Sequence, residues 1–414
     1  MITFRPFRAI RPCPEHAQSV ASRPYDVLDS EEARKEAAGN KNSFLRVIKP
    51  EIDLPESTNL YADEVYHTGK KTFSQMIEDG IFQSDSSPAF YIYRLTMDGR
   101  TQTGLVGCCH FEEYYDGRIK KHELTRTAKE NDRVRHVETL EANAEPVFFS
   151  YRGQSEIDQM VDGIIQAEPV YDFFADDGIR HELWICEDLP TIERLSAHFQ
   201  SLDSLYVADG HHRTAAAARV GKKRKENNPS HTGEEEYNFF LAVLFPDDQL
   251  KILDYNRVVK DLNGYSEESF LQRLSQDFEL TKADFATVKP SKIREFAMYL
   301  SGRWYRLTPR EEVRAQDPVA DLDVTLLSQF ILQPILQIGD LRKSERIDFV
   351  GGIRGLSELA QRVDSGEMAV AFALHPVSME QLLAIADAGE IMPPKTTWFE
   401  PKLRSGLFVH SIKD

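Results

Sequence analysis

Residues 209–214 combine the side chains in this sequence that are best suited to bind an anion or move a proton. A short apolar run precedes them and an alanine run follows, which predicts a strand, a tight turn and a helix. The first turn of a helix leaves N–H groups unpaired, and its dipole favours an anion. Gly210 allows a ligand to approach closely, Arg213 offers a bidentate oxyanion donor, and Thr214 offers a hydroxyl. An ordinary turn capped by Asp209 is the alternative, but two adjacent histidines beside an arginine favour a phosphate-bearing small ligand.

A second candidate is Glu123, which follows His122 in a segment that predicts the start of a helix. The pair is not a zinc-protease motif, because Arg126 occupies the position where that motif needs its second histidine. A glutamate in a first helical turn most often complements the helix dipole. The spacing alone therefore leaves a catalytic role for Glu123 open.

A third candidate is the segment 392–399, in which two prolines stiffen a loop that presents Lys395, Thr396 and Thr397. One cation and two hydroxyls suit a carboxylate or a phosphate group. Proline-rich loops are common, so these residue types by themselves do not distinguish a binding loop from an ordinary connection.

The composition limits the classes of function. The chain has 414 residues and a net charge of −17, from 67 acidic and 50 basic side chains. This balance argues against broad binding to a nucleic-acid backbone, although one small phosphate site needs only a few donors. No apolar stretch approaches the ~20 residues of a membrane span, and the N-terminus has no apolar signal segment. Four cysteines without a C-x-x-C pair make neither a disulfide scaffold nor a zinc site. We expect a soluble cytoplasmic protein with neither a membrane nor a nucleic-acid partner.

The elements that must position these residues alternate between strands and helices, which predicts an α/β or α+β fold. A weakly marked division falls near residue 260. The main predicted elements are a hairpin of strands at 89–95 and 103–112, a strand at 44–48, a helix at 122–140, a strand at 205–208, a hairpin of strands at 239–245 and 250–259, and a helix at 293–300.

The three candidate segments occur in an order that resembles known proteins. The turn at 209–214 resembles the phosphate-binding turn of the ParB/sulfiredoxin-like superfamily. Together with 122–123 and 389–397, it resembles the ADP-dependent free serine kinases. The whole chain, including 23–27 and 42–45, is similar to an uncharacterised bacterial family.

The resemblance implies a fold and a division of the chain. It implies a ParB/sulfiredoxin-like nucleotide-binding core at 105–260, an N-terminal α/β elaboration at 1–104, and a C-terminal α/β region at 261–414 that contributes the Pro-Lys-Thr-Thr loop. The chain departs from the kinases in three places, which are a long segment ahead of His122, a long insertion before Asp209, and the sequence at 398–402.

The resemblance also implies roles for particular residues. Glu123, Asp209 and His211 are expected to be catalytic; Gly210, His212, Arg213 and Thr214 to bind the phosphates; and Lys395, Thr396 and Thr397 to bind the acceptor. No metal ligand is assigned, although Mg²⁺ is expected to accompany the nucleotide.

The function implied by the resemblance is transfer of phosphate from ADP or ATP to the hydroxyl of free serine or a similar small acceptor, with Glu123 as the base. The alternative is a ParB-like nucleotide-binding regulatory protein without kinase activity. The net charge and the lack of an evident helix-turn-helix argue against a DNA-binding version. A sulfiredoxin-like reductase is not favoured because no cysteine occurs at 209–219. A family member that keeps the phosphate site but has lost or altered its chemistry is a third reading.

Overall fold

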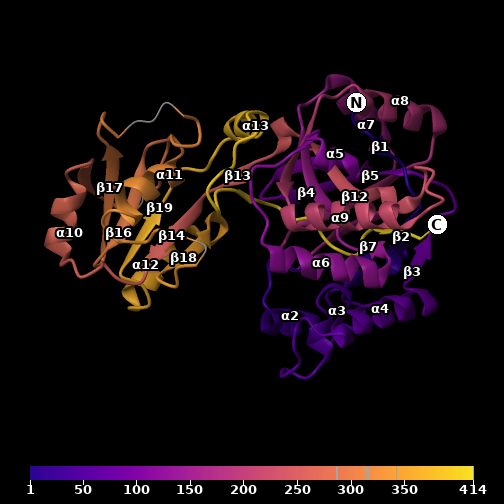
Figure 1. Ribbon diagram of the computed structural model, residues 1–414, viewed down its shortest axis with the longest axis horizontal. Helices are drawn as coiled ribbons and strands as arrows, with labels where there is room; N and C mark the ends of the chain where they lie inside the picture. Colours follow the sequence, from indigo (N-terminus) through magenta and orange to yellow (C-terminus); the bar gives the residue numbers. More distant parts are fainter. Residues whose placement is uncertain (286–287, 314–316, 342, 414) are drawn as a thin grey trace. The chain divides into compact units, whose positions relative to one another are not determined.

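The protein is described by a computed structural model that covers residues 1–285, 288–313, 317–341 and 343–413. The chain forms two compact units. Unit 1 consists of Met1–Lys121, Thr125–Leu250 and Pro401–Asp414, and unit 2 of His122–Leu124 and Lys251–Glu400. Both units mix strands and helices (Figure 1), which confirms the predicted mixed α/β class. The ParB/sulfiredoxin-like assignment of residues 105–260 stays a prediction.

The large sheet of unit 1 has the strand order β6-β11-β8-β12-β5-β4-β10-β9, with β1 beside β5. Its strands are β1 Phe4–Arg5, β4 Phe90–Met97, β5 Arg100–His110, β6 Ile119–Lys120, β8 Val147–Tyr151, β9 Tyr171–Phe174, β10 Arg180–Cys186, β11 Leu205–Asp209 and β12 Phe239–Pro246. Strand β11, which leads to the candidate turn, pairs parallel with β6 and antiparallel with β8. Its pairing with β8 shifts register between Val207 and Asp209, so the regular ladder is interrupted where the turn begins.

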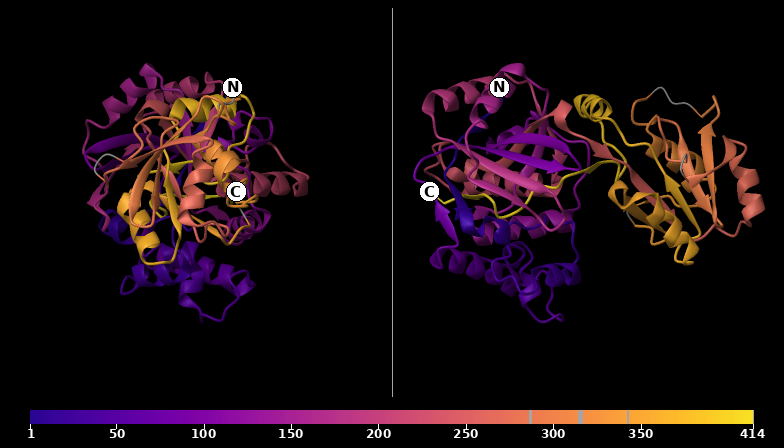
Figure 2. Two further views of the ribbon diagram at one scale, coloured as in Figure 1. Left: turned by 90° about the vertical axis from the view of Figure 1, so that its left-hand side faces the viewer. Right: turned by 180° about the vertical axis from the view of Figure 1, so that it is seen from behind.

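A smaller sheet and several helices complete unit 1 (Figure 2). The sheet has the order β3-β2-β21-β7, with bounds β2 Ala9–Pro12, β3 Phe82–Ser84, β7 Ala142–Asn143 and β21 Val409–Ser411. The helices are α1 Ala17–Val20, α2 Ser30–Ala37, α3 Leu45–Ile48, α4 Asp63–Glu78, α5 Glu112–Tyr115, α6 Thr127–Leu140, α7 Ser155–Ile164, α8 Leu189–Gln200 and α9 His211–Asn227. Helices α6 and α9 lie side by side (Figure 1), so residues just before α6 can reach the start of α9.

Unit 2 is built on a sheet with the order β15-β17-β16-β19-β14-β18 and a two-stranded ladder of β13 and β20. The strands are β13 Ile252–Leu253, β14 Tyr255–Val259, β15 Phe278–Ala283, β16 Phe296–Leu300, β17 Arg303–Pro309, β18 Ile347–Gly351, β19 Val370–Ala373 and β20 Trp398–Phe399. The helices are α10 Glu267–Leu274, α11 Asp323–Leu327, α12 Gly355–Asp364 and α13 Met379–Asp387. The ladder of β13 and β20 anchors the chain that leaves the Lys395–Thr397 loop.

Several local predictions are confirmed and several are wrong. Strands β4 and β5 form the predicted hairpin, and β11 and α9 flank the predicted turn. The strand predicted at 44–48 is wrong, because Leu45–Ile48 is the helix α3, whose apolar side chains are buried in the same core cluster as Phe73 and Phe82. The helix predicted from residue 122 begins only at Thr127, so Glu123 is not in a first helical turn.

Two predictions failed because they needed knowledge of distant partners. The helix predicted at 293–300 is wrong, since Phe296–Leu300 is strand β16, paired with β17 and β19 and buried along its whole length. The hairpin predicted between 239–245 and 250–259 is also wrong. Strand β12 pairs with β5 and β8, whereas β14 pairs with β18 and β19.

Candidate functional site

The backbone at Gly210 shapes the candidate turn. Gly210 has φ of +87° and ψ of 34° and is the N-cap of α9, so the chain turns directly from β11 into the helix. A Cβ here would lie 3.1 Å from atoms of the Arg213 guanidinium, and the left-handed conformation disfavours other residues. Glycine has no side chain that could cap the helix, so the first N–H groups of α9 are suited to an anion.

Arg213 supports the turn from the interior. Its guanidinium is buried, and Nη1 donates to the carbonyl oxygen of Pro146 at 2.5 Å. Nη2 lies 3.6 Å from Oδ2 of Asp209 and 4.0 Å from Oδ2 of Asp26. Burial alone would lower the pKa of Arg213, but the carboxylates of Asp26 and Asp209 raise it. The side chain is thus a fixed cation behind the turn.

Asp209 forms an ion pair that the sequence did not predict. Nζ of Lys402 lies 3.4 Å from Oδ2 of Asp209, and both side chains are largely enclosed. Burial would raise the pKa of the Asp209 carboxyl, but Lys402, Arg213 and His211 lower it, so the group is ionised. Lys402 falls in the segment where the sequence departs from the kinases, and no motif marked it.

The two histidines of the turn lie in different surroundings. His211 is buried at the first position of α9. The backbone N–H of Arg126 donates to Nε2 of His212 at 3.0 Å, so this ring is neutral and carries its proton on Nδ1. Burial lowers the pKa of His212, and Lys129 and Arg126 add to the shift against the opposing effect of Asp26. The ring can therefore donate a hydrogen bond from Nδ1.

Thr214 has a role inside the turn. Its hydroxyl is buried and donates to the carbonyl oxygen of Gly210 at 3.0 Å, and its backbone N–H donates to the same oxygen at 2.9 Å. The hydroxyl hydrogen and the N–H of Thr214 are therefore both used to close the first turn of α9, and neither is left for a phosphate.

A polar network next to the turn holds the segment that contains Asp26. Oε1 of Glu145 accepts a hydrogen bond from the backbone N–H of Tyr25 at 3.1 Å, and Oε2 pairs with Arg133 at 3.2 Å. The guanidinium of Arg133 lies 3.9 Å from the centre of the Tyr25 ring. Because Tyr25 is held in this way, its neighbour Asp26 lies near Arg213, which gives the 23–27 segment a structural role.

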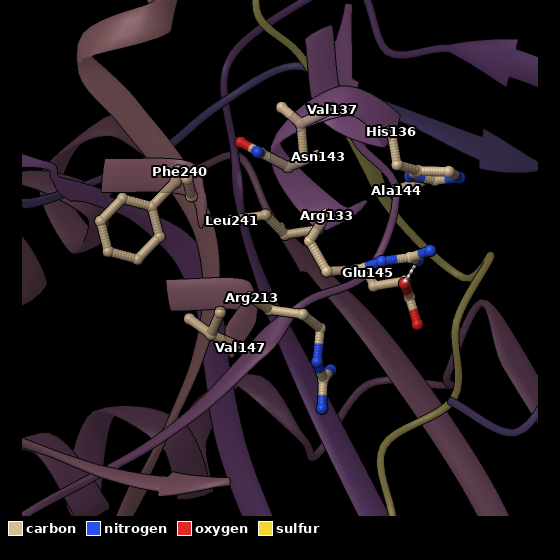
Figure 3. Close-up of a pocket in the computed structure, with 11 residues that line it drawn as sticks. Arg133, His136, Val137, Asn143, Ala144, Glu145, Val147, Arg213, Phe240 and Leu241 are labelled. Carbon is tan, nitrogen blue, oxygen red and sulfur yellow. Dashed lines mark hydrogen bonds and ion pairs between the residues drawn. The ribbon is translucent and has the colours of Figure 1, made fainter. Parts of the chain in front are cut away.

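A small cavity behind the turn is too small for a nucleotide. It has a volume of about 20 Å³, room for roughly one water molecule, and its lining includes Arg133, His136, Glu145 and Arg213 (Figure 3). Burial, together with Arg133, lowers the pKa of His136 to about 4, so this ring is neutral at pH 7. This cavity therefore cannot hold the phosphates of a nucleotide.

The remaining predicted site residues lie in unit 2. Nε2 of His122 is 3.3 Å from Oγ1 of Thr397, and the backbone N–H of Met392 donates to the carbonyl oxygen of His122 at 2.8 Å. The structure thus brings the segment of the half-buried Glu123 next to the predicted acceptor loop. Thr396 is buried and its hydroxyl donates to the carbonyl oxygen of Pro393 at 2.7 Å.

Comparison with known proteins places the chain in a family. The family described as protein of unknown function DUF1015 matches residues 4–325. The chain belongs to this family. No curated protein matches the DUF1015 chain. None of the described helices is both long enough and apolar enough to cross a membrane.

Solved structures are similar to the DUF1015 chain at a low level. A conserved hypothetical protein from Pyrococcus furiosus is 14% identical with a TM-score of 0.36, and the match covers 70% of this chain and 91% of that one. A free serine kinase in complex with AMP has the same identity and TM-score, with 70% and 89% covered. SbnI with a C-terminal truncation, from Staphylococcus aureus, is 10% identical with a TM-score of 0.38, with 72% and 85% covered.

Proposed function

We propose that residues 209–213 bind the terminal phosphates of ADP or ATP, and that the protein transfers a phosphoryl group to the hydroxyl of a small acceptor such as free serine. The observation that carries the proposal is the opening of α9 at the left-handed Gly210, with the ion pair of Asp209 and Lys402 beside it and Arg213 behind it. A helix start with a nearby cation suits a phosphate. The order of the three motifs, which resembles that of the free serine kinases, supports the choice of reaction.

Each group at the turn has a distinct task in this proposal. The N–H groups of the first turn of α9 bind phosphate oxygens, and Nδ1 of His212 donates a further hydrogen bond because its Nε2 is already engaged. Lys402 and Arg213 provide positive charge on either side of Asp209. Phosphoryl transfer depends mainly on such positioning and charge stabilisation.

Glu123 is proposed as the general base on the strength of the sequence resemblance. It would accept the proton of the acceptor hydroxyl as the oxygen forms its bond to phosphorus and the bond to the leaving nucleotide breaks. Glu123 precedes Arg126 by three residues, a chain length that spans at most about 11 Å, and the N–H of Arg126 donates to His212.

Mg²⁺ is compatible with the residues at the turn. The described residues contain no cluster of three or more histidine, cysteine or acidic side chains that could hold a metal by themselves. Mg²⁺ bound with a nucleotide needs only one or two carboxylates besides the phosphates, and Asp26 and Asp209 both face Nη2 of Arg213. When bound, the ion would offset the charge of the phosphates.

A ³¹P NMR assay with serine and either ADP or ATP tests the proposal, together with calorimetry of nucleotide binding. We expect Glu123→Gln to lower kcat by about 100-fold or more while the nucleotide Kd is unchanged. Lys402→Met should weaken nucleotide binding by about 10-fold, the effect of losing one interaction with a charged group. Glu138→Gln is the matched control for Glu123→Gln. Glu138 lies on α6 and pairs with Lys223 of α9.

Three results would count against parts of the proposal. Full turnover by Glu123→Gln would show that Glu123 is not the general base. Nucleotide binding without turnover of serine or related alcohols would favour a regulatory protein or an inactive relative. The absence of nucleotide binding would refute the phosphate site itself.

A further inference from the structure

Arg257 on β14 is buried and has no acidic partner within the part of the chain that the structure describes. None of its surface is exposed, yet among the described residues its guanidinium donates hydrogen bonds only to backbone carbonyl oxygens, and its Cζ lies 5.3 Å from the centre of the Phe349 ring. Nη1 donates to Tyr255, whereas Nη2 donates to Lys395 at 2.9 Å and lies 3.4 Å from the carbonyl oxygen of Pro394. Its Nε has no hydrogen-bond partner within the described part of the chain.

This arrangement is unusual for a buried arginine. Arg133 and Arg213 are also buried, and each faces carboxylates. A buried charge without a counter-charge is unfavourable because the loss of hydration is not offset, so such a group needs another reason to be retained. Burial lowers the pKa of Arg257 to about 10, and the side chain therefore remains charged at pH 7.

The carbonyl oxygens that Arg257 binds belong to the predicted acceptor loop. Lys395 has a φ of +60°, a left-handed conformation that residues other than glycine rarely adopt. The hydrogen bonds from Arg257 to the Pro394 and Lys395 carbonyls fix both peptide groups of this turn. The Lys395 ammonium lies 5.4 Å from the centre of the Tyr255 ring, on the strand that also carries Arg257.

We infer that Arg257 is a positioning residue that holds the Pro394–Lys395 turn in its binding conformation, and that its uncompensated charge selects acceptors bearing an acidic group. This inference rests on the proposed function, because it assumes that the loop binds the acceptor. Holding the loop requires the planar guanidinium of arginine, which reaches several carbonyl oxygens at once. The preference for an acidic acceptor requires only a positive charge. The two roles can therefore be separated by substitution.

The experiment compares Arg257→Met and Arg257→Lys with the wild type and with Arg362→Met, which removes an arginine of α12 in the same unit. Acceptor preference is measured with serine and serinol, in which a hydroxymethyl group replaces the carboxylate. Hydrogen exchange of residues 392–397 reports the loop directly. If the wild type has no turnover, calorimetric Kd values for serine and serinol replace the kinetic constants.

We expect Arg257→Met to raise the KM for serine by about 10- to 100-fold, with the KM for the nucleotide unchanged, and to speed exchange in the loop. The wild type should prefer serine to serinol by about tenfold or more, and Arg257→Met should lose this preference. Arg257→Lys should keep the preference for serine over serinol but lose the slow hydrogen exchange of the loop. Arg362→Met should resemble the wild type.

The inference would be overturned by unchanged loop exchange in Arg257→Met, by equal use of serine and serinol in the wild type, or by an effect on the nucleotide KM alone. Wild-type protein that binds neither acceptor would also overturn it. Binding of serine over serinol without turnover would instead refute only the proposed phosphoryl transfer.

Discussion

Replacement of Lys402 by methionine tests the ion pair next to the candidate turn. The substitution removes the ammonium that lies 3.4 Å from Oδ2 of Asp209 and keeps an unbranched side chain of similar length. The side chains of Lys402 and Asp209 are 12% and 27% exposed, so the pair is shielded from solvent but not fully buried. Asp209 keeps Arg213 at 3.6 Å after the substitution.

The magnitude follows from this partial burial. An exposed ion pair contributes at most about 1 kcal/mol, whereas loss of one partner of a fully buried pair costs about 3–5 kcal/mol. We expect an intermediate loss in the free energy of unfolding of unit 1, about 2 kcal/mol at pH 7. Because the folded state lowers the pKa of Asp209, this contribution is complete above the unfolded pKa of about 3.9 and is lost as the pH falls through the folded value.

Urea titrations read by hydrogen-exchange mass spectrometry measure this effect, since peptides from β11 report unit 1 separately. Lys413→Met is the matched control, because Lys413 pairs with Glu141 at 3.1 Å while its own side chain is 56% exposed. The control should lose less than about 1 kcal/mol. Equal losses in the two variants, or a loss in Lys402→Met that stays constant from pH 7 to acid pH, would refute the ion pair.

Three further predictions concern the turn. Gly210→Ala should lower the free energy of unfolding by more than Gly39→Ala in a urea titration, because both positions have positive φ but only the Cβ at 210 would crowd a guanidinium, at 3.1 Å. An NMR titration should give His212 a pKa below its ordinary 6.5. The neutral ring, which accepts the N–H of Arg126, therefore contributes stability above about pH 6.5. This stability is lost as the pH falls from 6.5 toward the pKa of His212 in the folded protein. Arg213→Met should cost about 2–3 kcal/mol in the same urea assay, since it removes one of the two cations beside the partly exposed Asp209 carboxylate and leaves the buried Pro146 carbonyl oxygen without its donor.

Local sequence patterns determined the elements whose partners are close along the chain. The hairpin of β4 and β5 follows from two apolar runs around Asp98-Gly99, and the apolar run, glycine and alanine run around Gly210 define β11, the turn and α9. Short apolar runs were ambiguous, because burial on all sides suits a strand or a helix equally. This ambiguity explains why Leu45–Ile48 is a helix and Phe296–Leu300 a strand, contrary to prediction.

Contacts between distant residues were decided only by the tertiary structure. Lys402 reaches Asp209 across 193 positions, and Arg257 reaches Lys395 across 138. No local spacing marks either pair, because a charged side chain in a loop has the same sequence pattern whether it is solvated or buried against a distant partner. The sequence therefore determined the strand, turn and helix around Gly210. The tertiary structure decided which charged side chains surround that turn, because only folding of the chain brings side chains from distant positions into contact and out of water.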